Sequence, residues 1–409
     1  MKLWLKYLIG ILLGVLLFLV LPDGAGADGG TVAFLADLGL RIAGYVVVLL
    51  LFFGIPVAIC EFFEDGIFWR SFGKTVLLYA IGAALFSAVG AAITWAFSPI
   101  RVPLLADIAA EPATGFQDSI LRLFPADPSR IFSDAATSLA PLLLFAFVLG
   151  IAFSHDRVMT RPAVTFFDSM HHVFYQISTF LAETMGILLI PISVAAAYRM
   201  EGIIDKGFYG HFLLLLGGEI LFAALAVIPL ILYFLGGRKN PYPTIYAFLG
   251  PALVAMVSGD LKPAAGLISK HGRESLGISR RTDSLVMPLG LTIGRAGTAL
   301  VTASAFVAIL SSYSSLGTTL PNMLRLLFIV PVAVLFAGSG SGAGPLMALA
   351  TTCSLFGKGF ENGHLVIVPL AFPLAAAGSF LDALWIGAAT AIRARKDGSE
   401  EAKPIRHHI

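Results

Sequence analysis

Apolar residues dominate the chain in long runs that recur at regular intervals, with most polar residues collected between them. A helix needs about 20 apolar residues to cross the roughly 30 Å hydrocarbon core of a bilayer. Eight runs predict membrane-spanning helices, near 4–22, 37–60, 75–97, 138–154, 164–198, 210–236, 285–311 and 364–392. The run over 164–198 exceeds one crossing, so we expect this helix to tilt or to extend beyond the bilayer.

Two further apolar regions, 244–270 and 322–358, are interrupted in the middle. The first breaks at 258–263 (SGDLKP) and the second at 337–345 (AGSGSGAGP). Backbone that leaves the helix at membrane depth is tolerated only where protein or a water-filled cavity covers it. Both regions therefore predict re-entrant helical hairpins, which enter and leave the membrane on the same side.

The predicted span over 285–311 is itself interrupted. Pro288, Gly290, Gly294 and Gly297 disturb its helical pattern, and Arg295 lies within this break. Broken helices form the midplane substrate sites of secondary transporters. An arginine inside the bilayer is also a functional candidate. The pattern therefore indicates transport of a small solute.

Composition supports a membrane protein and excludes several other classes. Only 13% of the residues are charged and 57% are hydrophobic, whereas a soluble domain carries about 25% charged residues. The net charge of +2 gives no indication of nucleic-acid binding. The two cysteines, Cys60 and Cys353, cannot form a disulfide framework or a metal cluster. The glycine-rich segment 338–344 lacks the Lys-Ser/Thr of a phosphate-binding loop, so neither an enzyme nor a cofactor or metal is expected.

The distribution of basic residues predicts the orientation, because loops on the cytoplasmic side are rich in Lys and Arg. With eight spans and two hairpins, both termini face the cytoplasm, and we expect the chain in a bacterial inner membrane. The cytoplasmic set is then Arg70, Lys74, Arg157, Arg161, Arg238, Lys239, Lys270, Arg273, Arg280, Arg281, Arg395, Lys396, Lys403 and Arg406. The opposite loops have only Arg101, Arg122, Arg130, Arg199, Lys206 and Lys358.

The N-terminal apolar run allows two interpretations. Lys2 and Lys6 precede it, and Ala-Gly-Ala follows at 25–27, which is the arrangement of a cleaved signal peptide. It is equally that of a first span with its basic end in the cytoplasm, which we favour. At the other end, 396–409 is charged and is expected to be a cytoplasmic tail.

Several segments, in this order and spacing, resemble motifs of the dicarboxylate/amino acid:cation symporter family, which includes the glutamate transporters. They are 123–128 (LFPADP) with 144–152 (LFAFVLGIA), 191–194 (PISV), 276–279 (LGIS) with 288–290 (PLG), 343–344 (AG) and 381–382 (LD). The resemblance covers most of the chain. It implies an all-α polytopic fold with eight transmembrane helices and two re-entrant hairpins, assembled as a homotrimer in the lipid bilayer.

The resemblance also implies an elevator mechanism, in which a transport domain moves through the membrane against a scaffold. Scaffold elements would be about 1–62 and 138–200, and transport elements about 74–97 and 208–395. It assigns the substrate site to Asp382, which holds a substrate amine in the family, to Thr298, and to hairpin-tip residues. The tip residues here are Ser258, Ser339, Gly340 and Ser341.

Departures from the family pattern are informative. The asparagine and aspartate that help to hold sodium are Gly294 and Ala296 here, and a further sodium-binding aspartate is Arg393. Trp385 replaces the arginine that binds a side-chain carboxylate. At a few ångströms and an effective dielectric near 20, like charges repel by about 4 kcal/mol. We therefore expect lost or altered sodium coupling, unless Arg393 merely reaches to the interface. Asp382 with Trp385 favours a neutral or cationic amine over a dicarboxylate, unless Arg295 already neutralises Asp382.

Two other acids, Glu183 and Glu219, lie in predicted spans and match no family motif. Buried carboxylates can bind protons, so both acids are candidates for ion coupling, together with Arg393. Alternatively, each acid simply pairs with a nearby polar group. Asp382, Glu219 and Asp260 are the expected partners of Arg295, because an unpaired guanidinium inside a membrane is costly.

The sequence thus predicts a secondary transporter of a small polar organic solute. Because Asp382 is kept, we expect this solute to be amino-acid-like. An anion or solute channel, or a non-transporting regulatory homologue, are the alternatives.

Overall fold

The computed structural model describes residues 2–21, 30–97, 121, 123–136, 138–204, 209–313, 319–337, 344–357 and 359–398. Every regular element among them is a helix. The N-terminal part comprises α1 (Leu3–Val20), α2 (Thr31–Glu64), α3 (Phe68–Phe97), α5 (Arg130–Ser133), α6 (Ala140–His155) and α7 (Arg157–Ile204). The remainder comprises α8 (Gly210–Phe222), a π-helix η2 (Ala223–Val227), α9 (Ile228–Leu235), α10 (Tyr242–Ser258), α11 (Lys262–Leu276), α12 (Arg280–Thr292), α13 (Ala296–Tyr313), α14 (Leu320–Ala337), α15 (Gly344–Phe356), a 3-10 helix η3 (Gly363–Leu370) and α16 (Ala371–Lys396).

The chain is a multi-pass membrane protein. Seven helical stretches in the described part are long and apolar enough to cross a bilayer: Leu3–Val20, Thr31–Glu64, Phe68–Phe97, Val158–Glu201, Gly210–Leu235, Arg280–Tyr313 and Gly363–Lys396. The span expected over 138–154 corresponds to α6, which is apolar but has only 16 residues. The total of eight spans therefore stays a prediction.

The interruptions lie close to where the sequence predicts them. The first hairpin turns between α10 and α11, where Gly259 adopts φ +67°, a left-handed conformation that favours glycine. The second lies between α14 and α15, and its tip, 338–343, falls outside the described residues.

The break between α12 and α13 is shorter than expected. The helix continues through Pro288 and Gly290, and only 293–295 are non-helical. Tyr79 of α3 packs against this region: a Cβ at Gly290 would lie 2.6 Å from its hydroxyl oxygen, and one at Gly294 would lie 2.5 Å from its ring. The Tyr79 hydroxyl also donates to the Val286 carbonyl at 3.0 Å. These glycines therefore admit an aromatic side chain, and only Gly294 coincides with the loss of helix.

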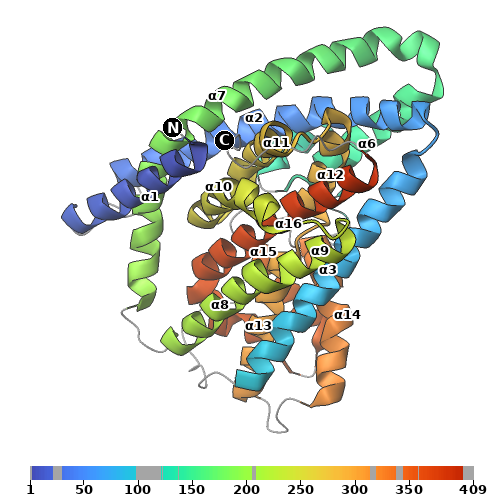
Figure 1. Cartoon of the computed structure of the whole chain (residues 1–409). Helices are drawn as coiled ribbons and strands as arrows, with labels where there is room; N and C mark the ends of the chain where they lie inside the picture. The colour runs from blue at the N-terminus through green and yellow to red at the C-terminus, as the bar shows by residue number, and fades with distance from the viewer. Residues whose placement is uncertain are drawn as a thin grey trace.

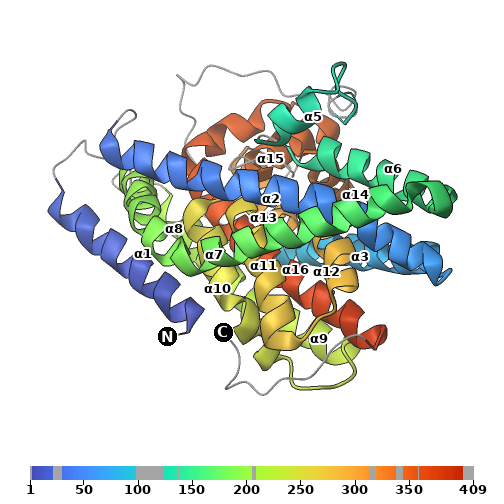
Figure 2. The ribbon, with the colours of Figure 1, turned by 90° about the horizontal axis from the view of Figure 1, so that it is seen from above.

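The helices form two sets. Helices α1, α2, α6 and α7 pack on one another and lie over one side of the molecule, as Figures 1 and 2 show. The other set is α3 with the helices from α8 to α16, and within it α13 packs on α3 and α16. Helix α7 alone has 48 residues, or about 72 Å at 1.5 Å per residue, more than twice the hydrocarbon thickness. The two sets match the predicted scaffold and transport elements, an assignment that stays a prediction.

A short connection joins the two sets at the corner between α2 and α3 (Figure 1). Only Asp65, Gly66 and Ile67 lie between the helices. Gly66 adopts φ +67°, so the chain reverses direction there in a conformation that other residues rarely adopt.

Helix α1 packs on α7 through backbone contact at small residues. A Cβ placed on Gly10 would lie 2.1 Å from the carbonyl oxygen of Gly186, and one on Gly14 would lie 2.5 Å from that of Ile190. By contrast, a Cβ at Gly44 in α2 has nothing within 4 Å. Close approach of this kind is typical of helix association in membranes.

These contacts predict opposite effects for two Gly-to-Ala substitutions. Gly10→Ala should lower stability by about 1–3 kcal/mol, because a backbone carbonyl must move. Gly44→Ala should be neutral or slightly stabilising, since alanine favours a helix over glycine by about 1 kcal/mol. The apparent Tm in detergent, followed by fluorescence-detected size-exclusion chromatography, measures both. An unchanged Tm for Gly10→Ala would contradict the α1–α7 packing.

Candidate functional site

The centre of the candidate site is a contact between the broken helix and α16. Asp382 of α16 is 0% exposed. Its Oδ1 accepts the backbone N–H of Thr298 at 3.0 Å, and its Oδ2 accepts the Thr298 hydroxyl at 2.6 Å. Gly297 permits the close approach, because a Cβ there would lie 2.5 Å from the Gly378 carbonyl oxygen and 2.7 Å from the Asp382 nitrogen.

This contact provides an acceptor for backbone N–H groups that the break leaves without partners. The first N–H groups of α13 have no acceptor within their own helix, and no water is available in a bilayer to replace it. The Asp382 carboxylate supplies one acceptor, and its negative charge lies at the positive end of the helix dipole. A carboxylate has about four lone-pair positions; Thr298 occupies two, and the backbone of Gly297 also hydrogen-bonds to this carboxylate. Asp382 can therefore cap α13 and still accept a hydrogen bond from a ligand ammonium group.

Arg295, inside the break, is buried, with 3% of its surface exposed. Its Nε donates to the Leu291 carbonyl at 2.9 Å, another backbone group at the end of α12. Asp382 and Asp260 are the acids whose charges act on the guanidinium. Two of the three expected partners are therefore close to Arg295, while Glu219 belongs to a different cluster.

The tip of the first hairpin brings further polar groups to this region. Asp260 Oδ1 accepts the backbone N–H of Lys262 at 3.2 Å at the start of α11, and the side chains of Asp260 and Lys262 also interact electrostatically. Lys262 is buried and lies near enough to Arg295 for their charges to repel. The Ser258 hydroxyl lies 2.8 Å from the Val254 carbonyl and 3.0 Å from that of Asp260, so it stabilises the turn.

The cluster is electrically balanced. It contains two carboxylates, Asp382 and Asp260, and two cations, Arg295 and Lys262, all connected by electrostatic interactions. The other expected contacts, Ser339, Gly340 and Ser341, lie outside the described residues. A site with adjacent anionic and cationic groups and no net charge matches a ligand that has both an ammonium and a carboxylate group.

Two predicted site residues lie away from this cluster. Trp385 packs on α3, with its ring 5.6 Å from that of Phe86, and lines an apolar cavity of about 220 Å³ with residues of α3 and α9. Arg393 donates to the Ser71 hydroxyl of α3 at 2.7 Å and pairs with Asp397 at 3.1 Å. Arg393 is buried, so it does not extend along the membrane surface; it anchors the end of α16 to the start of α3.

The two acidic coupling candidates have different surroundings. The Glu183 side chain is 57% exposed and pairs with Lys270 of α11 at 3.4 Å. Glu219 is 1% exposed and accepts hydrogen bonds from Thr94 and Ser304. Of the two, only Glu219 is a buried carboxylate without a described cationic partner.

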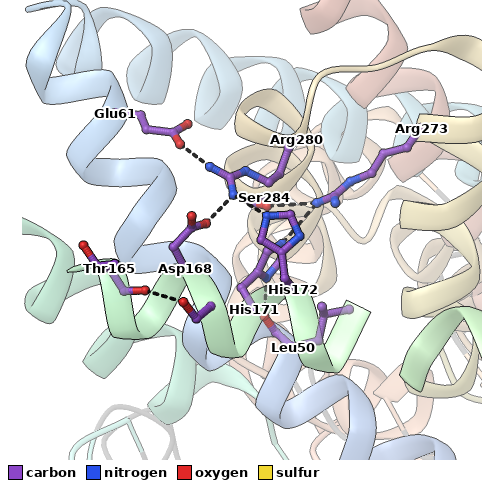
Figure 3. A network of polar contacts seen from close by, with 10 residues as sticks. Leu50, Glu61, Thr165, Asp168, His171, His172, Arg273, Arg280 and Ser284 are labelled. Carbon is purple, nitrogen blue, oxygen red and sulfur yellow. Dashed lines mark hydrogen bonds and ion pairs between the residues drawn. The ribbon is translucent and has the colours of Figure 1, made fainter. Parts of the chain in front are cut away.

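A polar network joins the two helix sets (Figure 3). Arg280, at the start of α12, reaches Glu61 of α2 and Asp168 of α7 at once, and its Nη1 lies 3.3 Å from His172. Next to it, Arg281 pairs with Asp65.

Arg273, on the preceding helix α11, contacts three groups. It pairs with Asp283 at 3.0 Å and lies 3.3 Å from both Ser284 and His171, which in turn approaches the Leu50 carbonyl at 3.3 Å. The first hairpin and α12 are thus fastened to α2 and α7 by charged groups on several helices (Figure 3).

Sequence reasoning missed some of these residues. Lys262 lies within the predicted hairpin break, and its position two residues after Asp260 was the available signal. The sequence contains no indication of a role for Thr94 and Ser304. Their contact with Glu219 arises only from the packing of α3, α8 and α13. The same holds for Ser71, the partner of Arg393.

Comparison with known proteins agrees with this architecture. The model of a family described as "Sodium:dicarboxylate symporter family" matches residues 3–380. A serine/threonine transporter SstT of Streptococcus suis is 28% identical over 360 residues, which cover 85% of this chain and 93% of the relative. Proteins of the same name from Acinetobacter baylyi and Streptococcus agalactiae are 27% and 26% identical, over 69% and 86% of this chain and 70% and 85% of their own lengths.

The Thr298–Asp382 contact predicts a measurable loss of stability. Thr298→Val removes a hydroxyl donor from a buried carboxylate, which should cost about 1.5–3 kcal/mol, the range for hydrogen bonds to charged groups. Thr298→Ser keeps the hydroxyl and loses one methyl group, so it should cost about 0.8 kcal/mol. The apparent Tm of the two variants in detergent shows whether the hydroxyl or the methyl group contributes more to stability. Equal losses would show that the hydroxyl does not stabilise the cap.

Proposed function

The chain belongs to the sodium:dicarboxylate symporter family, and on this basis we propose that it is a secondary transporter of a small, zwitterionic amino acid. The observation that supports this most directly is the balanced cluster of Asp382, Asp260, Arg295 and Lys262. Transfer of net charge into a bilayer is costly. A zwitterion offers an ammonium group to Asp382 and a carboxylate to a cation, and it leaves the net charge of the site unchanged.

The residue at one position of α16 agrees with this substrate class. Trp385 occupies the position where the family places an arginine for a side-chain carboxylate, its ring packs on α3, and the basic residues of α16 lie in its last turn. An acidic substrate would therefore bring a second carboxylate without a matching cation at this position. The relatives named as serine/threonine transporters act on amino acids with neutral side chains, and we propose L-serine and L-threonine as the first substrates to test.

We also propose that transport is independent of sodium. The family's side-chain ligands for sodium are Gly294 and Ala296 here, which offer no side-chain oxygen, and Arg393 adds a cation. A hard cation requires several oxygen ligands. Arg393 is tied to Ser71 and Asp397, so its charge stays at the end of α16.

The remaining parts of the proposal follow the family architecture. They are eight spans with two re-entrant hairpins, a homotrimer in the bacterial inner membrane with both termini in the cytoplasm, and movement of α3 and the helices from α8 to α16 against α1, α2, α6 and α7. The network around Arg280 (Figure 3) joins these two sets through separable ion pairs. These ion pairs can all break when one helix set moves relative to the other.

Asp382→Asn should reduce substrate binding about tenfold or more, because a hydrogen bond between a carboxylate and an ammonium group contributes about 1.5–3 kcal/mol. Counterflow of radiolabelled L-serine and L-threonine in proteoliposomes measures the effect. Asp37→Asn is the matched control, since this acid pairs with Arg41 on the exposed surface of α2.

Thr298→Val separates the two roles of Asp382, because it weakens the cap and keeps the carboxylate. It should retain more counterflow than Asp382→Asn. Wild-type counterflow in Asp382→Asn would refute the assignment of the amine site. A linear, unsaturated current in place of counterflow would identify a channel.

Replacing sodium by choline should leave the initial rate of uptake unchanged, because the side-chain carboxylates that hold sodium in the family are missing. The measurement is uptake into proteoliposomes at constant ionic strength and pH, with potassium as a further substitute. A steep dependence on sodium would show that backbone carbonyls and the hairpin tips build a sodium site without those side chains.

A further inference from the structure

Glu219 forms a compact polar cluster where three helices meet. Its Oε1 accepts the Thr94 hydroxyl of α3 at 2.7 Å, and its Oε2 lies 2.5 Å from the Ser304 hydroxyl of α13. All three side chains are buried, with Glu219 itself 1% exposed. The cluster therefore joins α8 to two helices of the same packed set and has no described route to water.

No cation balances the Glu219 carboxylate in the described part of the chain. Among the residues that the structure describes, the two hydroxyl groups are the only polar side chains that act on it. Charged and titratable groups do occur on α8 and on the described helices packed against it, but none of these acts on Glu219: His211, Arg70, Lys74, Tyr79, Tyr313, Asp382, Arg393, Arg395 and Lys396. A lone carboxylate at this depth is costly while ionised, so the site favours a bound positive charge.

The hydroxyl partners accommodate both forms of the acid. The Ser304 oxygen lies within hydrogen-bond distance of Glu219 Oε2 and, at 3.0 Å, of the Leu300 carbonyl. Its single hydrogen can serve only one of them at a time. When Glu219 is ionised, Ser304 donates to the carboxylate. When Glu219 is protonated, its O–H donates to Ser304, which then donates to Leu300. Every polar group is satisfied in either state, without movement of the backbone.

The geometry favours a proton over a metal ion. A hard cation lies about 2.0–2.6 Å from each oxygen ligand. The oxygens here are 2.5 and 2.7 Å apart, which are hydrogen-bond distances, so a metal ion would have to replace both hydrogen bonds. A proton needs no additional space, because the existing hydrogen bonds only exchange donor and acceptor.

The surroundings of the cluster are those of a functional site. A π-helical turn, Ala223–Val227, begins four residues after Glu219, and such turns occur frequently at functional sites. Ser304 lies on α13 six residues after Thr298, or about 9 Å along the same helix. The helix whose first turn is capped by Asp382 therefore also forms one wall of the Glu219 cluster.

We propose that Glu219, held by Thr94 and Ser304, is a proton-binding site whose proton travels with the substrate. This inference rests on the function proposed above. The carboxylate takes one proton from the side where substrate enters and returns it to water on the side where substrate leaves. The neutral acid crosses the membrane together with the substrate, and the ionised acid returns without it, so each cycle carries one proton with one substrate.

The test uses purified full-length protein in proteoliposomes with radiolabelled L-serine and L-threonine. Wild-type protein should accumulate substrate when the lumen is alkaline and the outside is acid, without sodium. Glu219→Gln should lose this accumulation and keep exchange of substrate for substrate, because glutamine keeps the shape and cannot release a proton. Glu183→Gln tests the other acidic candidate, which is exposed and paired with Lys270. Asp37→Asn is the matched control, since this acid is exposed and paired with Arg41 within α2; it should behave like wild type.

Three transport outcomes would overturn the proposal: pH-driven accumulation in Glu219→Gln, loss of accumulation in Glu183→Gln alone, or accumulation in wild type that requires a sodium gradient. The last would leave the proposed substrate class intact. Absence of exchange in wild type would instead refute the proposed substrates.

A spectroscopic measurement tests whether Glu219 binds a proton, independently of transport. Infrared difference spectra between acid and alkaline pH should show the C=O stretch of a protonated carboxyl group that is missing in Glu219→Gln. Ser304→Ala should shift the pH at which this band appears. Identical spectra for wild type and Glu219→Gln would overturn the proposal.

Discussion

A bilayer offers no water to a backbone N–H or C=O group, so each interruption of a helix must find its partners within the protein. The break at 293–295 meets this constraint through side chains on both of its sides. Arg295 donates to the carbonyl of Leu291, and Asp382 accepts from Thr298. The glycines beside it allow Tyr79 and α16 to approach closely enough to cover the freed backbone. The placement of α3, α13 and α16 around one another follows from this requirement.

Much of the architecture could be predicted because hydrophobic length and helix interruption are local properties of the sequence. The first hairpin turn and the break before α13 lie within the segments where the pattern predicts them, and the second predicted break falls between α14 and α15, outside the described residues. Pro288 and Gly290 were weaker signals, since a helix tolerates them when a neighbouring side chain fills the space. The partners of Glu219 and Arg393 could not be predicted, because Thr94, Ser304 and Ser71 come from helices distant in sequence. Their roles depend on packing, which periodicity does not encode.

Several charged residues inside this membrane protein lie in three kinds of environment. Arg295, Lys262, Asp260 and Asp382 compensate one another at the break. Arg280 and Arg281 of α12 meet Glu61, Asp168 and Asp65 across the boundary between the helix sets, as Figure 3 shows for Arg280. Glu219 accepts hydrogen bonds from neutral hydroxyl groups and has no cationic partner among the described residues. These environments suggest separate tasks of ligand recognition, reversible docking and proton binding, because each responds to a different change: a ligand, a displacement or a change in pH.

The three-residue connection between α2 and α3 limits how the two helix sets can separate. From Glu64 to Phe68 there are four residue steps, and an extended chain covers about 3.3–3.6 Å per step. The ends of the two helices can therefore be at most about 13–14 Å apart while both remain intact. A longer excursion would require the end of α2 or the start of α3 to unwind. This connection therefore acts as a tether that keeps the end of α2 and the start of α3 close together.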